Sequence, residues 1–348
     1  MCAAGRVPEY AGTTQVVPCM TTLPPLSILD RALARSGTGE SAALQSVLDR
    51  ARGIDGQGIS RFWVAEHHGV PGIAGSAPAV LMAAVAAATS RVRVGAGGIM
   101  VPNHQPLVVA EQFSTLDQLH PGRIDLGVGR SLGFTPAVRA GLRTTTYGDA
   151  AFAADLAELG CYLAGTAPFT SRPRPAGRIP LFILATRSGA AIAAQAGAGV
   201  VLGGPVLDDP QRARATVEAY RQAFRASECG DRPYVMIAVN VAAADTDERA
   251  RGLLLPEAWA MAQSRTLGEF RALEPVDTVR ARQMSARQRG LVDHHLDAAV
   301  HGTGAVVRER LAELAALTGA DELLLTGATH DLDDQARSDM ILAGLAQE

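Results

Sequence analysis

Residues 63–68 read Trp-Val-Ala-Glu-His-His, so a short apolar run ends in the carboxylate of Glu66 and the imidazoles of His67 and His68. Histidine titrates near neutral pH and can accept a proton from a reacting group and return it. A hydrogen-bonded structural histidine is the commoner case, and we assign His68 to it. Because His67 directly follows a predicted strand, we take it as the candidate for acid–base catalysis.

Three glycines, Gly95, Gly97 and Gly98, lie where the next predicted strand ends. Glycine at such a point lets the backbone approach a flat partner closely, or adopt a conformation that a side chain would forbid. A bulge that only redirects the chain is the alternative explanation. The loop that follows carries His104, which either faces a pocket or stabilises local structure.

Two later segments have the composition of anion sites. Residues 127–133 present backbone N–H groups and the guanidinium of Arg130, but the third glycine is one position late for a dinucleotide-binding fingerprint. Thr186 and Ser188 supply hydroxyls at the predicted N-terminus of a short helix, which favours an anion. A tight turn and a simple N-cap are the alternatives. Because the two loops follow neighbouring strands, together they predict a phosphate site.

A further cluster consists of His294, Asp297 and His301, which would share one face of a helix. A metal site is conceivable for such residues. However, one helix rarely supplies three ligands to one ion, so we favour a solvated face or an interface and predict no metal site.

The elements that position these residues form an alternating pattern after residue 24. Short apolar runs are typical of parallel strands covered on both faces, and helical patterns separate them. This order predicts an α/β fold, a (β/α)8 TIM barrel over residues 25–348, with residues 1–24 as an N-terminal extension. The predicted strands are 26–29, 61–65, 92–97, 123–128, 180–184, 199–202, 234–241 and 322–325.

About 80 residues separate the seventh and eighth predicted strands, which is too long for a simple crossover. We expect residues from about 246 to 300 to form an insertion over the C-terminal end of the barrel. That end carries the active site in barrels of this kind.

Composition excludes several classes of function. Hydrophobic residues make up 47% and charged residues 19% of 348 residues, which is enough for a large core. A net charge of −3 offers no basic stripe for nucleic acid or an anionic membrane. All 32 basic residues are arginine, so mechanisms that need a lysine amine are excluded. Four widely spaced cysteines fit no disulfide framework, and no apolar run or leader suggests a membrane span or secretion, so we expect a cytoplasmic protein.

Seven segments together resemble the bacterial luciferase-like flavin-dependent monooxygenase family, and within it the actinobacterial natural-product group. The resemblance implies a (β/α)8 barrel with an insertion after the seventh strand. It also implies that reduced FMN and O2 act through a C4a-(hydro)peroxyflavin to oxygenate a small organic substrate, such as a polyketide or another secondary metabolite. The segments are residues 26–30, 63–68, 94–106, 110–112, 116–123, 124–130 and 318–323.

Carried over position by position, the resemblance makes His67 the active-site histidine and places a cis peptide bond between Gly97 and Gly98, beneath the flavin ring. Gly129 stands where luciferase has a reactive cysteine, so light emission is not implied. The family's serine-rich phosphate segment is not reproduced around residues 186–188. The cofactor-binding residues implied by the resemblance are Glu66, Gly97, Gly98, Arg130, Thr186 and Ser188.

No second nucleotide fingerprint is present for NAD(P)H, so we expect a separate NAD(P)H-flavin reductase to supply the reduced flavin. The family also implies a homodimer. Two alternatives remain within the superfamily: an oxidoreductase that uses the deazaflavin F420, and a non-catalytic flavin-binding homologue. A metal-dependent barrel hydrolase that uses His67 or the cluster at His294 is a third.

Overall fold

The computed structural model describes residues 22–185 and 188–347. Its parallel strands close into a barrel, because β10 pairs with β1 on one side and with β8 on the other. Every strand of this ring overlaps one of the eight predicted apolar runs, so the predicted TIM barrel is confirmed. The ring consists of β1 (Leu26–Asp30), β2 (Arg61–Val64), β3 (Arg93–Ala96), β5 (Ile124–Gly129), β6 (Leu181–Ala185), β7 (Gly199–Gly203), β8 (Val235–Ala243) and β10 (Glu322–Thr326).

Two short strands extend the ring and were not predicted. β4 (Ile99–Met100) pairs with the end of β5, and β9 (Val300–Gly302) pairs with the end of β8. Each has only two or three residues, too few to carry a recognisable period. Both lie beyond the carboxyl ends of the ring strands and shape the loops there.

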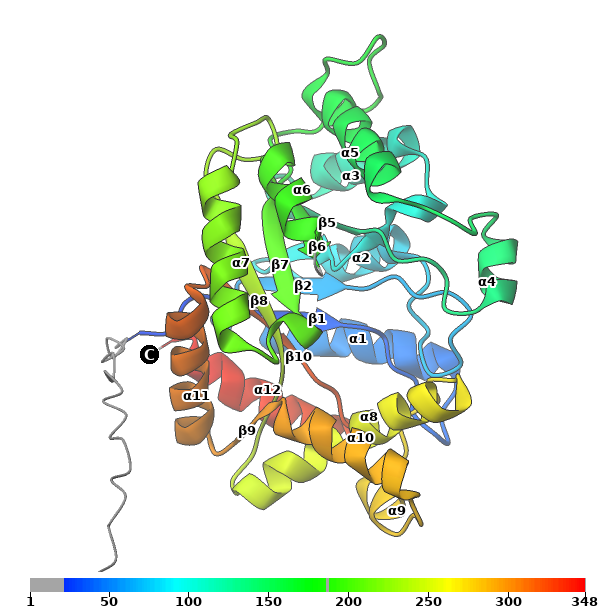
Figure 1. The fold of residues 1–348 in the computed structure, drawn as a ribbon, viewed down its shortest axis with the longest axis vertical. Coiled ribbons are helices and arrows are strands. Elements are labelled where there is room, and N and C mark those ends of the chain that lie inside the picture. Colours follow the sequence, from blue (N-terminus) through cyan, green and yellow to red (C-terminus); the bar gives the residue numbers. More distant parts are fainter. Residues whose placement is uncertain (1–21, 186–187, 348) are drawn as a thin grey trace, which may run out of the picture.

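Helices surround the barrel on its outer face (Figure 1). Their buried apolar residues recur at helical spacing: Val109, Phe113 and Leu116 are buried on α3, and Val307 and Leu311 on α11. Within the described ranges, no helix is both long and apolar enough to cross a membrane. The surrounding helices are α1 (Glu40–Ile54), α2 (Pro78–Ala88), α3 (Pro106–Leu119), α5 (Asp149–Ala164), α6 (Gly189–Ala196), α7 (Pro210–Ala223), α11 (Gly304–Thr318) and α12 (Leu332–Leu345).

Between β8 and α11, the chain forms α8 (Asp247–Leu267), α9 (Val276–Arg280) and α10 (Ala286–Asp297), drawn in yellow to orange in Figure 1. Leu253 and Trp259 of α8 belong to one buried cluster with Val292 and Leu296 of α10, separate from the main core. These helices contact Arg31, which follows β1, Ala328, which follows β10, and Asn240 in the second half of β8, so they lie at the C-terminal end of the barrel.

The interior of the barrel is filled at the opposite end. Trp63, Phe182 and Met236 pack in its centre. Below them, Arg61 donates to Asp125 at 2.7 Å and to Glu322 at 3.0 Å, and both carboxylates are fully buried. Because these groups close the N-terminal end, the interior of the barrel is open to a ligand from its C-terminal end.

Candidate active site

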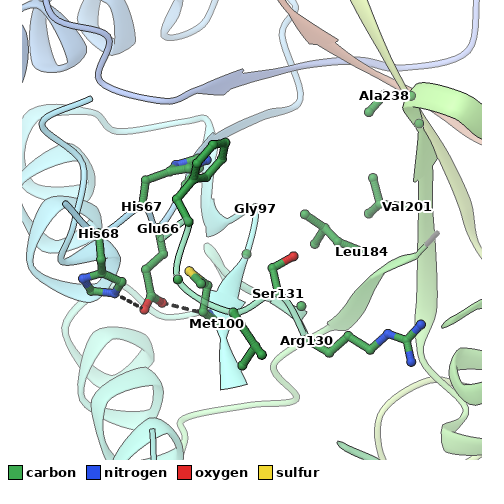
Figure 2. Close-up of a pocket in the computed structure, with 18 of the residues that line it drawn as sticks. Glu66, His67, His68, Gly97, Met100, Arg130, Ser131, Leu184, Val201 and Ala238 are labelled. Atoms are coloured by element: carbon green, nitrogen blue, oxygen red, sulfur yellow. Dashed lines mark hydrogen bonds and ion pairs between the residues drawn. The ribbon is translucent and has the colours of Figure 1, made fainter. Parts of the chain in front are cut away.

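A cavity of about 580 Å³ opens at the C-terminal end of the barrel, within the size range of small-molecule sites. The loops after β2, β3 and β5 line it together with the ends of β6 and β7 (Figure 2). Five predicted site residues line this cavity: Glu66, His67, Gly97, Gly98 and Arg130. Ser188 contacts Arg130 from outside the lining, whereas Thr186 lies outside the described residues.

His67 lies in the loop that follows β2, where its backbone N–H donates to the carbonyl of Gly75 at 2.8 Å. Its Nδ1 is buried and has no hydrogen-bond partner among the described residues. Burial and the charge of Arg31 lower the pKa of His67 to about 4, against the opposing charge of Glu66. At neutral pH the imidazole is therefore uncharged and can accept a proton.

Glu66 points the other way and organises the loop around it. Its buried carboxylate accepts hydrogen bonds from His68 Nε2 at 2.7 Å and from the Met100 N–H at 2.8 Å (Figure 2). It also accepts one from His104 Nε2 at 2.9 Å. Burial raises the pKa of Glu66, but His104, His68 and the Met100 N–H outweigh that effect and hold it below its usual value. Glu66 thus fixes β4 and two imidazoles.

His104 and His68 are brought together by this carboxylate. His68 is therefore a hydrogen-bonded histidine, as predicted, and His104 stabilises local structure, which was one of the two roles considered for it. Glu66 and His104 are 38 positions apart, and only the register of β2 with β3 and the turn into β4 brings them into contact. No spacing rule links such positions, so the cluster could not be read from the sequence.

The peptide bond between Gly97 and Gly98 is cis, as the resemblance implies. A Cβ on Gly98 would lie 2.9 Å from the carbonyl oxygen of Gly127, and one on Gly97 would lie 2.8 Å from Leu29 Cδ1. Neither position has room for a side chain. The cavity therefore has bare backbone along this side.

Arg130 directly follows β5 and reaches toward the N-termini of α5 and α6. Its Nη2 donates to Ser188 Oγ at 3.2 Å, and its guanidinium forms an ion pair with Asp149, the first residue of α5. The Ser188 hydroxyl in turn donates to Asp149 Oδ2 at 2.8 Å and does not cap α6. The sequence placed Arg130 and Ser188 in one anion site but missed Asp149.

The donors and walls of the cavity suit a planar ligand that carries a phosphate group. A guanidinium and a hydroxyl at one end are ordinary phosphate partners. Leu184, Val201 and Ala238 form an apolar wall opposite His67 (Figure 2). A Cβ added to Gly129 would meet no atom within 4 Å, so the backbone there faces open space.

The predicted sharing of one helix face by His294, Asp297 and His301 is wrong. α10 ends at Asp297, and His301 lies on β9 instead, because the chain turns at Ala298 to pair with β8. Arg251 lies between Asp297 and His301. It donates to Asp297 at 3.0 Å, and its Nη1 is 3.4 Å from His301 Nε2. Over the described part of the chain, no group of three acidic, histidine or cysteine side chains is arranged to hold a metal ion.

A second polar network beside the cavity was not predicted. Glu257 of α8, only 1% exposed, forms an ion pair with Arg31 and accepts the Ala328 N–H at 3.1 Å. His295 of α10 contacts Asn240 of β8 at 3.0 Å. Burial would raise the pKa of Glu257, but the charges of Arg31 and His295 keep it below its usual value.

Comparison with known proteins identifies the family of the chain. Residues 26–322 match the model of the luciferase-like monooxygenase family. A luciferase-like monooxygenase of Escherichia coli (strain K12) is 35% identical over 316 residues, covering 89% of this chain and 93% of the relative. N-acetyl-S-alkylcysteine monooxygenase of Bacillus subtilis is 50% identical over 110 residues, or 31% of this chain and 32% of that protein. The crystal structure of apo-MsnO8 has a TM-score of 0.82 at 32% identity, covering 93% of this chain and 98% of the other. The chain therefore belongs to the luciferase-like monooxygenase family.

Proposed function

We propose that this protein is a flavin-dependent monooxygenase that uses reduced FMN and O2 to oxygenate a small organic substrate. The observation that supports this most strongly is one cavity with three features. It has a side of bare glycine backbone, an arginine–serine pair at one end, and an uncharged histidine with a free nitrogen. Reduced FMN, when bound, supplies the electrons that activate O2.

Different residues of the chain bind the phosphate group and the ring of the cofactor. Arg130 and Ser188 hold the phosphate group through charge-assisted hydrogen bonds, and Thr186 is proposed to add a further contact. Gly97 and Gly98 let the flavin ring lie directly against backbone. Glu66 supports this surface from behind, because its carboxylate fixes the Met100 N–H two residues after Gly98.

His67 moves the proton. Since its pKa lies near 4, its imidazole is uncharged at neutral pH and can accept a proton from the reacting centre and return it later. The helices α8 and α10 cover the barrel end beside it and exclude water, which would otherwise compete for the activated oxygen.

The substrate class is proposed from relatives. The natural-product group suggests a polyketide or another secondary metabolite, and the relative from Bacillus subtilis is named for N-acetyl-S-alkylcysteine. Both are small organic molecules. Because a bound flavin ring would fill part of the cavity of about 580 Å³, we propose that the substrate lies partly in the remaining space and partly in the open mouth of the cavity.

F420 is the alternative cofactor. The FMN complex of a 3,6-diketocamphane monooxygenase constituent has a TM-score of 0.69 at 18% identity, and an F420-dependent secondary alcohol dehydrogenase has 0.66 at 15%. At such identities only the fold is shared, so the choice rests on the site. An F420 enzyme would transfer hydride and ignore O2.

We also propose that a separate NAD(P)H-flavin reductase delivers the reduced FMN and that the protein acts as a homodimer. Light scattering tests the second proposal. A reductase added with NAD(P)H and FMN should replace chemically reduced FMN in the assay.

Anaerobic titration with reduced FMN, reduced riboflavin and reduced F420 tests the cofactor assignment. We expect reduced FMN to bind more tightly than the other two, since riboflavin has no phosphate for Arg130. Tighter binding of F420 would transfer the assignment to a deazaflavin enzyme, and no binding of any of the three would exclude a flavin-dependent function.

A further inference from the structure

The guanidinium proposed to bind phosphate already has an anionic partner within the chain. Arg130 forms an ion pair with Asp149, and the Ser188 hydroxyl bonds to both residues, as acceptor from Arg130 and donor to Asp149. The three side chains therefore form a closed triangle. Both groups proposed for the phosphate are engaged by one carboxylate.

Neither helix that meets at this point needs Asp149 or Ser188 for its own cap. Gly148 is the N-cap of α5 and Ser188 that of α6, and neither helix has a side-chain cap from its N-cap residue. The side chains of Asp149 and Ser188 are used for the triangle instead. This arrangement points the carboxylate at Arg130 rather than at backbone N–H groups.

The carboxylate occupies the position that a phosphate oxygen would take against the guanidinium. A phosphate monoester carries about −1.5 to −2 charges at pH 7. If Asp149 stays in place, the two anions repel each other across Arg130; if it leaves, the gain from the new ion pair is offset by the loss of the old one. In both cases Asp149 lowers the affinity for the phosphate.

We propose that Asp149 is the counter-ion that the flavin phosphate displaces from Arg130, and that it keeps FMN weakly bound and exchangeable. The inference rests on the proposed function, since it takes the cofactor to be a flavin phosphate. It adds an affinity-determining residue on α5. Weak binding suits a flavin that arrives reduced from another protein and must leave oxidised.

If Asp149 instead helps Arg130 to bind the phosphate, the expected change in FMN affinity has the opposite sign. If the carboxylate mainly orients Arg130 toward the phosphate, removing it weakens FMN binding. The sign of the effect of Asp149→Asn on FMN affinity therefore decides between displacement and orientation.

The experiment is a fluorescence titration of the full chain with FMN and with riboflavin, comparing wild type with Asp149→Asn. We expect Asp149→Asn to bind FMN about twofold to fivefold more tightly and riboflavin with unchanged affinity. The inhibition constant of inorganic phosphate against FMN should also be lower in the variant. Because Asp149 is 51% exposed, the difference should shrink as salt is raised from about 0.01 M to 0.5 M.

Two further variants serve as controls. Asp49→Asn removes the same charge from an exposed ion pair on α1, with Arg52, and should leave FMN affinity unchanged. Arg130→Met should weaken FMN binding and not riboflavin binding, which reports on the proposed function itself.

Unchanged or weaker FMN binding by Asp149→Asn, with FMN binding still dependent on Arg130, would overturn the displacement proposal alone. FMN binding that does not depend on Arg130 would overturn the phosphate site, and with it the part of the proposed function on which this inference rests.

Discussion

Three imidazoles lie at or beside the cavity, and they differ in what they bond to. His68 and His104 both bond to the Glu66 carboxylate, whereas His67 Nδ1 has no partner in the part of the chain that the structure describes. A group that is already hydrogen-bonded must lose a partner before it reacts, but His67 loses nothing. At the scale of single residues, His67 is therefore the candidate for proton transfer.

His67→Ala should lower the rate of substrate oxygenation by about 10²–10⁴-fold, the usual loss when a general acid–base group is removed. FMN affinity should change little, because Arg130 and the glycine backbone hold the cofactor. The matched control is His294→Ala, an exposed histidine on α10 that should keep full activity. A His67 variant with wild-type turnover would contradict the assignment.

The pH profile gives a second test of His67. A base works only when uncharged, and its pKa of about 4 lies below the ordinary 6.5, so lowering the pH protonates it only near pH 4. The rate that depends on His67 should therefore stay level from pH 8 down to about pH 5 and fall below that. An acid limb near pH 6.5 that disappears in His67→Ala would show that the imidazole has an ordinary pKa.

Site residues could be predicted from the sequence where the residue type itself indicates a chemical role. His67, Arg130, Ser188 and the two glycines were selected because each lies at or after the end of a predicted strand and because the family resemblance gives these positions a role. The structure places them around or beside one cavity. Asp149 was missed because an acidic residue in the first turn of a helix has an ordinary local explanation. Its contact with Arg130 depends on how α5 packs beside β5 and α6.

At the scale of elements, β5 contains a matched pair of glycines. A Cβ on Gly127 would lie 2.0 Å from the carbonyl oxygen of Ala96, which is backbone and cannot rotate away, whereas a Cβ on Gly129 would meet nothing within 4 Å. Gly127→Ala should therefore lower the free energy of unfolding by at least about 3 kcal/mol, and Gly129→Ala by less than about 0.5 kcal/mol. Denaturant unfolding of both variants measures this, and equal effects would contradict the packing described for β3 and β5.

The helices α8 and α10 should depend on one buried carboxylate. Glu257→Leu removes the ion pair to Arg31 and the acceptor of the Ala328 N–H, leaving a partly buried guanidinium without its partner. We expect a loss of about 3–5 kcal/mol and faster amide hydrogen exchange in residues 247–267 and 286–297. Glu269→Gln, in an exposed pair with Arg271, is the control and should change neither. Unaltered exchange in Glu257→Leu would show that this ion pair does not hold the helices in place.

Helices and strands were easier to predict from the sequence when they were long and when their apolar residues recurred at a regular spacing. Each ring strand is built mainly of buried apolar residues, and the sequence placed all of the strands within about two positions. β9 was missed, and with it the end of α10, because three residues of strand cannot be told from a continuing helix. That error is why His301 was placed on the wrong element.

At the scale of the whole molecule, the two ends of the barrel have different roles. The N-terminal end is closed by Arg61, Asp125 and Glu322, and the C-terminal end holds the cavity. Barrels of this kind keep stability at the first end and chemistry at the second. The barrel itself was predictable from the alternation of strands and helices. The placement of Arg61, Asp125 and Glu322 together at one end was not, because it depends on how the strands pair around the closed barrel.

Arg61→Met should therefore destabilise the fold without changing the site. It leaves two buried carboxylates with fewer partners, at a cost of about 3–5 kcal/mol, while FMN affinity of the folded protein stays within twofold of wild type. The control is Arg214→Met, which breaks an exposed pair with Glu218 on α7. A large change in FMN affinity at a temperature where the Arg61 variant is folded would contradict the separation of the two ends.

The most direct test of the account is stopped-flow absorbance after the anaerobic complex of protein and photoreduced FMN is mixed with oxygenated buffer. A flavin-dependent monooxygenase should reoxidise the flavin through a transient spectrum different from both reduced and oxidised FMN, with kinetics that change in His67→Ala. Reoxidation identical to that of free reduced FMN, with no transient and no effect of His67, would contradict a monooxygenase function for this cavity.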